Sequence, residues 1–168
     1  GATVTGATTG TSALSTTADI PVGGTVTFTV TGTIASSALP PSLSNTATVT
    51  APAGYTDTNP ANDTSTWTTL LARQGDLAVV KTGTASAAPG QPISYTIVVS
   101  NLVVPGGSSD VLGAVIADAF PLGVTGLSGV SWSVSGTSGG ATVTGATTGT
   151  SALSTTADIP VGGTVTFT

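Results

Sequence analysis

The chain lacks the side chains on which most protein chemistry depends, since it contains no Cys, His or Met. Its acidic residues are all Asp, and its only cations are Arg73 and Lys81. General acid–base catalysis mostly uses His, Glu or a Lys of altered pKa, and zinc sites are built from Cys and His. The composition therefore predicts a protein that is not an enzyme and has no resident cofactor.

The shortage of charge excludes further classes. A net charge of −5 with two cations provides no basic surface for nucleic acid. The longest apolar stretch, residues 111–120, is interrupted by Asp118 and is far shorter than the run of about 18 residues that a membrane span needs. We therefore expect neither a nucleic-acid partner nor a membrane span in this sequence.

One segment of the sequence occurs twice. Residues 1–29 read GATVTGATTGTSALSTTADIPVGGTVTFT, and residues 140–168 repeat them letter for letter at an offset of 139 residues. Self-similarity at a fixed period indicates a repeat protein, and this period is long enough for each unit to own a core. We expect a window of a longer tandem array, with residues 1–71 as the C-terminal portion of one repeat, 72–75 as a linker and 76–168 as the N-terminal portion of the next.

The hydrophobic pattern is that of an all-β protein. Polar and apolar residues alternate in many short segments, as in half-buried strands, and Gly- and Pro-containing turns separate them. Strands are predicted at 25–31, 45–50, 64–70, 77–81, 92–100, 111–118, 130–134 and 141–144. This spacing favours a β-sandwich of immunoglobulin-like type with extra strands or long loops. Trp67 and Trp132 are expected in its core.

A series of short motifs gives the repeat a family resemblance. In the order of one period they are DLAVVKT at 76–82, PGQ at 89–91, ISYTIVVSN at 93–101, DAFPLGV at 118–124, NTATV at 45–49 and DTNPAND at 57–63. The series resembles the repeat domain of large bacterial and archaeal surface proteins known as domain of unknown function number eleven. The resemblance implies tandem immunoglobulin-like sandwiches on secreted or surface proteins, without catalytic activity. Residues 102–110 and 136–150 depart from the shorter family pattern and leave the number of strands open.

Three residues have the chemistry of a self-formed isopeptide bond. Lys81 shares strand parity with inward-facing positions, as do Asn45 and Asp118. A buried Lys tends to lose its proton and become nucleophilic, and a buried Asp that keeps its proton can polarise an amide. Lys81 would pair with Asn45 of another repeat. The alternative is a Lys that extends to solvent, with Asn and Asp as ordinary hydrogen-bonded turn residues.

The loop at 57–63 is a candidate calcium site. Asp57, Asn59 and Asp63 offer the carboxylate and amide oxygens that calcium prefers, near a junction between repeats that a bound ion would stiffen. The spacing is not that of an EF-hand. The alternative is an Asx-rich turn before the next strand.

Two features favour attached glycans. Asn62 begins an Asn-Asp-Thr acceptor sequon. Alternation places a row of hydroxyls on one strand face, formed by Thr25, Thr27, Thr29 and Thr31, and sugars on such a row would keep a weakly charged fibre soluble. The alternative is that Thr is present because it favours strands and pairs well across them.

These observations together predict a structural role outside the cell. The leading hypothesis is a repeat of a long, glycosylated extracellular fibre or cell-surface stalk, whose partners are neighbouring copies of the same repeat. One alternative is an adhesin module that binds sugars or a host surface. Another is a pilus-like subunit assembled by donation of a strand between protomers.

Overall fold

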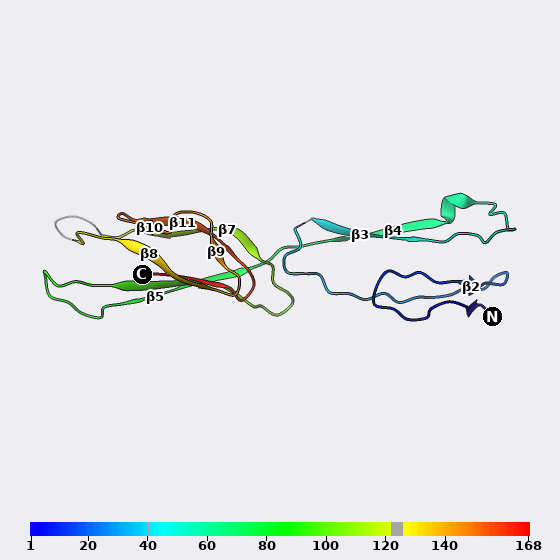
Figure 1. Cartoon of the computed structure of the whole chain (residues 1–168), viewed down its shortest axis with the longest axis horizontal. Helices are drawn as coiled ribbons and strands as arrows, with labels where there is room; N and C mark the ends of the chain where they lie inside the picture. Colours follow the sequence, from blue (N-terminus) through cyan, green and yellow to red (C-terminus); the bar gives the residue numbers. More distant parts are fainter. Residues whose placement is uncertain (40, 122–125) are drawn as a thin grey trace. The chain divides into compact units, whose positions relative to one another are not determined.

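The computed structural model describes residues 1–39, 41–121 and 126–168, which contain strands and a single turn of 3₁₀ helix but no α-helix. Two compact units are present, Gly1–Ile34 and Ala35–Thr168. The prediction of an all-β chain is confirmed (Figure 1). The repeat boundary predicted at residues 72–75 stays a prediction.

Two antiparallel sheets in the second unit share one core. The larger sheet has the order β10-β8-β12-β6-β5, and the smaller has the order β7-β11-β9. The larger sheet consists of β5 (Asp76–Gly83), β6 (Tyr95–Leu102), β8 (Trp132–Ser138), β10 (Thr148–Gly149) and β12 (Thr164–Phe167). The smaller consists of β7 (Val111–Asp118), β9 (Thr142–Val143) and β11 (Leu153–Ile159).

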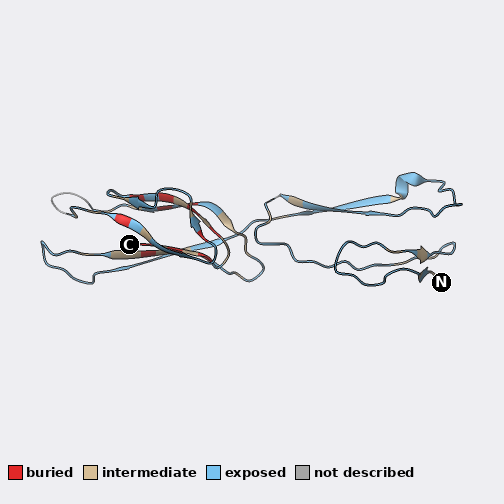
Figure 2. Ribbon diagram, viewed as in Figure 1, coloured by how far each residue is buried: buried red, intermediate tan, exposed pale blue. Residues whose placement is uncertain are grey.

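The core lies where the inward faces of these two sheets meet, as Figure 2 shows by burial. Strand alternation explains its membership, because every second residue of β6, β11 and β12 points inward. Its buried apolar members are Ile97, Val99, Ala114, Ile116, Trp132, Ala141, Leu153, Ala157, Ile159, Val165 and Phe167. Trp132 meets Phe167 edge to face, with ring centroids 6.1 Å apart. This arrangement is consistent with a β-sandwich, and the predicted core position of Trp132 is confirmed.

A second structural element of this unit is the hairpin of β3 (Ser42–Thr48) and β4 (Thr64–Leu70). One face is a ladder of hydroxyls, because Ser44 bonds Thr68 and Thr46 bonds Thr66, each at 2.8 Å. The opposite face carries Leu43, Ala47 and Trp67, and Trp67 is 77% exposed, whereas Leu70 shares the hydroxyl face. The expectation of Trp67 in a core is therefore wrong for this chain, because every residue of β4 is exposed (Figure 2).

The first unit contains one copy of the duplicated segment, with β1 (Thr3–Val4) paired to β2 (Ala18–Asp19). Its local hydrogen bonds match those of the second copy. The amide of Thr5 donates to the Thr17 carbonyl at 2.8 Å, and the amide of Thr144 donates to the Thr156 carbonyl at 2.8 Å. Identical sequence therefore gives the same hydrogen bonds at this strand pairing in both copies.

The two copies differ in their strands and in burial. The strand predicted at 25–31 is irregular, whereas the equivalent residues 164–167 form β12. That prediction is wrong for the first copy because a strand needs hydrogen-bonded neighbours, and only β12 has them, in β6 and β8. Ile20 is 54% exposed while the equivalent Ile159 is fully buried.

Candidate functional site

The clearest polar constellation joins the two sheets at their edges. Lys81 lies on β5 and Asp118 ends β7, and the Lys81 Nζ atom donates to Asp118 Oδ2 at 2.5 Å. The two side chains are 39% and 18% exposed. The sequence predicted both residues to point inward, and the structure brings them together across 37 positions of sequence.

Aromatic rings surround the amine. The Nζ atom of Lys81 lies 4.5 Å from the ring centroid of Tyr95 and 5.5 Å from that of Phe120. Such rings attract a cation through their faces. The amine therefore contacts Asp118 and two aromatic rings, while the Lys81 side chain stays 39% exposed.

Asn45, the third predicted member, lies elsewhere in the fold. It sits on β3 opposite Trp67 of β4, and the described hydrogen bonds of its side chain include neither Lys81 nor Asp118. In this chain the pair is thus present without the amide that the isopeptide chemistry requires. The Lys81 amine and the Asp118 carboxyl group are in contact, and an Asn45 amide from another repeat would supply the third group that an isopeptide bond needs.

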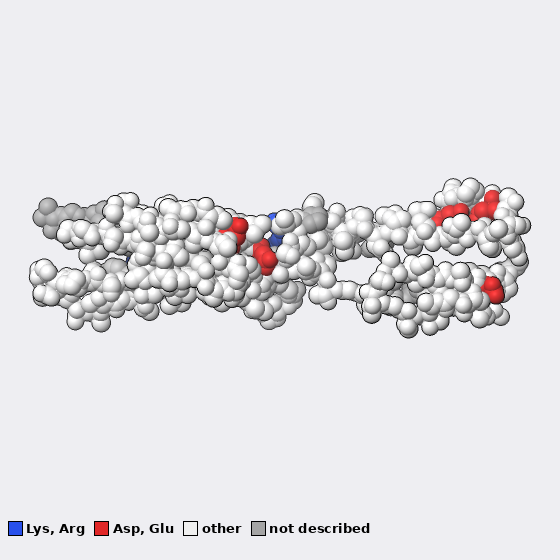
Figure 3. Space-filling view, viewed as in Figure 1, with Lys and Arg blue, Asp and Glu red and all other residues white. Residues whose placement is uncertain are grey.

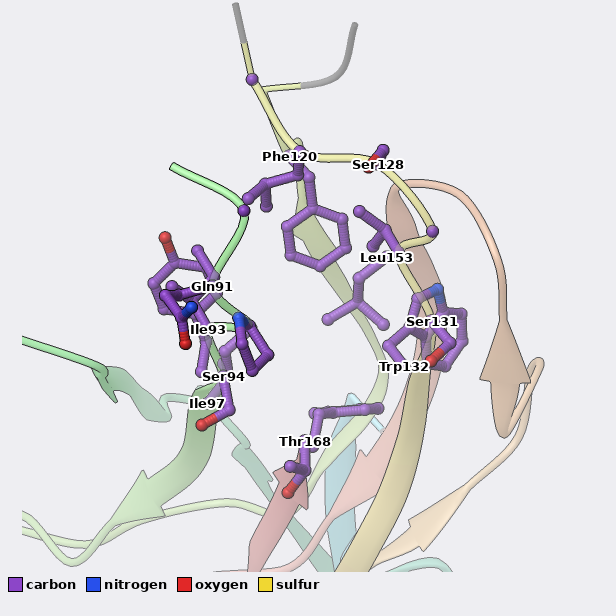
Figure 4. A pocket seen from close by; sticks show the side chains of 18 residues that line it. Gln91, Ile93, Ser94, Ile97, Phe120, Ser128, Ser131, Trp132, Leu153 and Thr168 are labelled. Carbon is purple, nitrogen blue, oxygen red and sulfur yellow. The ribbon is translucent and has the colours of Figure 1, made fainter. Parts of the chain in front are cut away.

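A pocket with both polar and apolar lining residues opens near this pair, at one end of the two sheets. Its volume is about 640 Å³. Figure 4 shows Ile97, Phe120, Trp132 and Leu153 around it. All of these are core or core-packed residues, so the pocket borders the hydrophobic core. The Nε1 atom of Trp132 is buried and has no hydrogen-bond partner among the described residues.

Asn101 is a structural residue that the sequence analysis missed. It is fully buried on β6, and its Nδ2 atom donates to the carbonyls of Ser109 and Ile159, each at 3.0 Å. These bonds tie the larger sheet to β11 of the smaller one. A signal was present in the sequence, because Asn101 shares parity with Ile97 and Val99 on an inward strand face.

The predicted calcium loop is an exposed turn. The Asp57 Oδ1 atom accepts from the backbone amide of Asn59 at 2.7 Å. Desolvation raises the pKa of Asp63, and the charge of Asp57 and a hydrogen bond with it raise that pKa further. Within residues 1–39, 41–121 and 126–168 no three His, Cys, Asp or Glu side chains form a group that could hold a metal. The calcium site stays a prediction.

The candidate glycan acceptors are solvent-accessible. Asn62 ends the 3₁₀ turn η1 (Pro60–Asn62) and is exposed. The predicted hydroxyl row is exposed at Thr25, Thr27, Thr29 and Thr31. Figure 3 shows a molecular face that is largely free of charged side chains. Glycan attachment stays a prediction.

Comparison with family models, curated proteins and solved structures finds no match for the chain. Within the part of the chain that the structure describes, no helix is long and apolar enough to cross a membrane.

Proposed function

We propose that the chain is a structural repeat of a long extracellular fibre or cell-surface stalk, built of immunoglobulin-like sandwiches in tandem. The observation that supports this is the duplicated segment, which has the same local hydrogen bonds in both copies and supplies core residues in one of them. In an array of this period, each repeat adds length to the fibre. The function is mechanical and needs no catalytic group.

Glycans are part of this proposal. The chain has few charges to keep a fibre dispersed (Figure 3), and many of its exposed residues are Ser and Thr. Sugars on Asn62 or on the exposed threonines would supply the missing hydration. Neighbouring copies of the repeat are the partners.

The test is the intact mass of native material under denaturing conditions, before and after removal of glycans. We expect a very large polypeptide whose mass falls on deglycosylation. A single species close to the mass of one repeat would contradict the tandem array. Unchanged mass after deglycosylation would contradict the glycan component alone.

The Lys81–Asp118 pair supports a covalent element within the fibre. An ion pair that becomes fully buried loses its solvation, and proton transfer from ammonium to carboxylate then removes both charges. The neutral Lys81 amine would attack Cγ of an incoming Asn45. The new amide C–N bond forms as the bond to Nδ2 breaks. The acid of Asp118 donates a proton to the leaving nitrogen, its carboxylate takes one from the attacking nitrogen, and ammonia departs.

The covalent bond has a direct readout. Deglycosylated native chains would be lighter by one ammonia per bond, and trypsin would no longer cut after Lys81, because it does not cleave at an acylated lysine. Lys81→Arg keeps the cation but removes the nucleophile, so it abolishes the mass deficit and restores the cut. Native material without the mass deficit, or with full cleavage after Lys81, would contradict the bond.

An adhesin role is the second candidate, supported by the exposed aromatic ring of Trp67 on the hairpin. Aromatic faces exposed to solvent are common in sugar-binding surfaces, because apolar ring contact combines with hydroxyl hydrogen bonds. Binding to a glycan array that disappears in Trp67→Ala would support this candidate. Binding that is absent in the unsubstituted chain would contradict it.

A further inference from the structure

We infer that the β3–β4 hairpin of one copy of this chain docks on the sheets of a second copy, where β3 pairs antiparallel with β7. This inference gives residue detail to the assembly of copies in the proposed function. It rests on two incomplete surfaces of the same chain, one on the hairpin and one on the sheets.

The acceptor surface is the inward side of β5 with the outer edge of β7. Val79 on β5 pairs with Val99 on β6, but Val79 is 66% exposed while Val99 is buried. The smaller sheet therefore covers β6 but not β5. Among the described residues β7 pairs with β11 alone, so its other edge has unpaired backbone groups that a further strand would satisfy.

The donor surface is the hairpin face that carries Leu43, Ala47 and Trp67. The exposed residues of this face share strand parity: Leu43, Asn45 and Ala47 of β3, with Ser65, Trp67 and Thr69 of β4. The opposite face is the hydroxyl ladder, which is suited to water. A hairpin with one apolar face is marginal alone and needs a second layer. Added at the edge of β7, it would lie over the exposed side of β5.

Polar groups set the register. Asn45 is the one polar side chain among apolar neighbours on the inward side of β3, and the Lys81–Asp118 pair is the polar group of the acceptor surface. Buried polar groups require hydrogen-bond partners, so Asn45 belongs opposite Asp118. Antiparallel pairing, which every described strand pair of this chain uses, then places Ala47 opposite Ile116.

The chain's own hairpin cannot reach this position. Strands β5 and β7 run in the same direction, because Lys81 contacts Asp118 at their ends and a Cβ on Gly75 would lie 2.6 Å from Val111 Cγ2 at their starts. In the docked register β4 would run in the same direction as β5 and β7. Leu70, at the end of β4, would then lie beyond Lys81 along this direction.

The distances then exclude docking within one chain. Leu70 would lie about eight strand positions from Asp76, or about 26 Å along the strand axis at about 3.3 Å per residue. Six residue steps connect Leu70 to Asp76, and they extend to about 22 Å at most. The occupant of the acceptor surface is therefore the hairpin of a second copy.

Two disabled variants test this inference by complementation. Trp67→Arg places a charge on the donor face, and Val79→Arg places one on the acceptor surface. Thr66→Arg, on the hydroxyl face of the same strand, is the matched control. All of these sites are exposed in the single chain, so thermal unfolding of each variant should match that of the unsubstituted chain.

Analytical ultracentrifugation from about 1 μM to about 1 mM covers weak and moderate affinities. We expect the unsubstituted chain and Thr66→Arg to associate with rising concentration, and Trp67→Arg and Val79→Arg each to stay monomeric. An equimolar mixture of the two disabled variants retains one intact donor and one intact acceptor, so it should form 1:1 dimers.

An unsubstituted chain that stays monomeric over this range would overturn the inference, as would a mixture that does not dimerise or a Thr66→Arg variant that fails to associate. These failures differ from failure of the fibre proposal, which depends on the mass of the native polypeptide.

Discussion

At the scale of single residues, the second unit depends on one buried amide. The Asn101 side-chain amide donates to the backbone carbonyl of Ser109, in the loop before β7, and to that of Ile159 on β11. Asn101→Leu would leave both carbonyls without a donor, and each such loss costs about 1–3 kcal/mol. We expect the free energy of unfolding to fall by about 2–4 kcal/mol. Guanidinium denaturation followed by Trp132 fluorescence, in a Trp67→Phe background, measures this.

The control for that substitution is Asn62→Leu, because Asn62 is exposed on the 3₁₀ turn. It should change the stability by no more than about 0.5 kcal/mol, as surface substitutions usually do. Equal stability of the Asn101→Leu variant and the unsubstituted chain would contradict the assigned role.

A second prediction at this scale concerns the loop of Asp57 and Asp63. NMR titration should give Asp63 a pKa above its ordinary value of 3.8, and Asp57→Asn should bring it back down. A raised folded-state pKa means that the folded state binds the proton more tightly, so this stabilising contribution is present at acidic pH and is lost as pH rises through the folded pKa.

The same titration in calcium tests the predicted ion site. A bound cation would lower the pKa of Asp63, because it favours the carboxylate. A pKa of Asp63 that calcium leaves unchanged would argue against the site. An Asp63 pKa at or below 3.8 without calcium would contradict the effect of desolvation and of the Asp57 charge on it.

At the scale of elements, the duplicated segment provides a matched pair within one molecule. Phe167 is 1% exposed and the equivalent Phe28 is 37% exposed. Phe167→Ala should cost about 3–5 kcal/mol, as truncation of a buried Phe usually does. Phe28→Ala should leave the unfolding of the second unit nearly unchanged. Denaturation followed by Trp132 fluorescence compares them, and an equal loss in both variants would mean that Phe28 is also a core residue in solution.

The limits of prediction from sequence also lie at this scale. Alternation correctly predicted the bounds of β4 and β7. Parity predicted that Lys81 and Asp118 both point inward, and the two side chains are in contact. Alternation could not tell residues 25–31 from β12, because the difference lies in which strands are available as neighbours. For the same reason it placed Trp67 in a core that this chain does not supply.

At the scale of the whole molecule, the donor surface on the hairpin and the acceptor surface on β5 and β7 are different surfaces, so the contact between two copies is heterologous. Such contacts build open chains of copies unless a rotation closes them into rings. The docked register, with Asn45 opposite Asp118, also places Thr46 opposite Ala117, both on the outward face. The chain has no Cys, so cysteines introduced at these two positions would report on this contact alone.

A chain carrying both Thr46→Cys and Ala117→Cys should form a ladder of disulfide-linked multimers on oxidation, because each copy uses one cysteine as donor and one as acceptor. Opposed positions on paired strands lie about 4.5–5.5 Å apart at Cα, which a disulfide can bridge. Non-reducing electrophoresis shows the ladder, and reduction should collapse it to a single band. Adding Trp67→Arg should abolish it, and moving the second cysteine to Ser133 on β8 should do the same. Cross-linking that stops at dimers would instead indicate a closed two-fold contact, and the chain would then lack the polarity that a fibre requires.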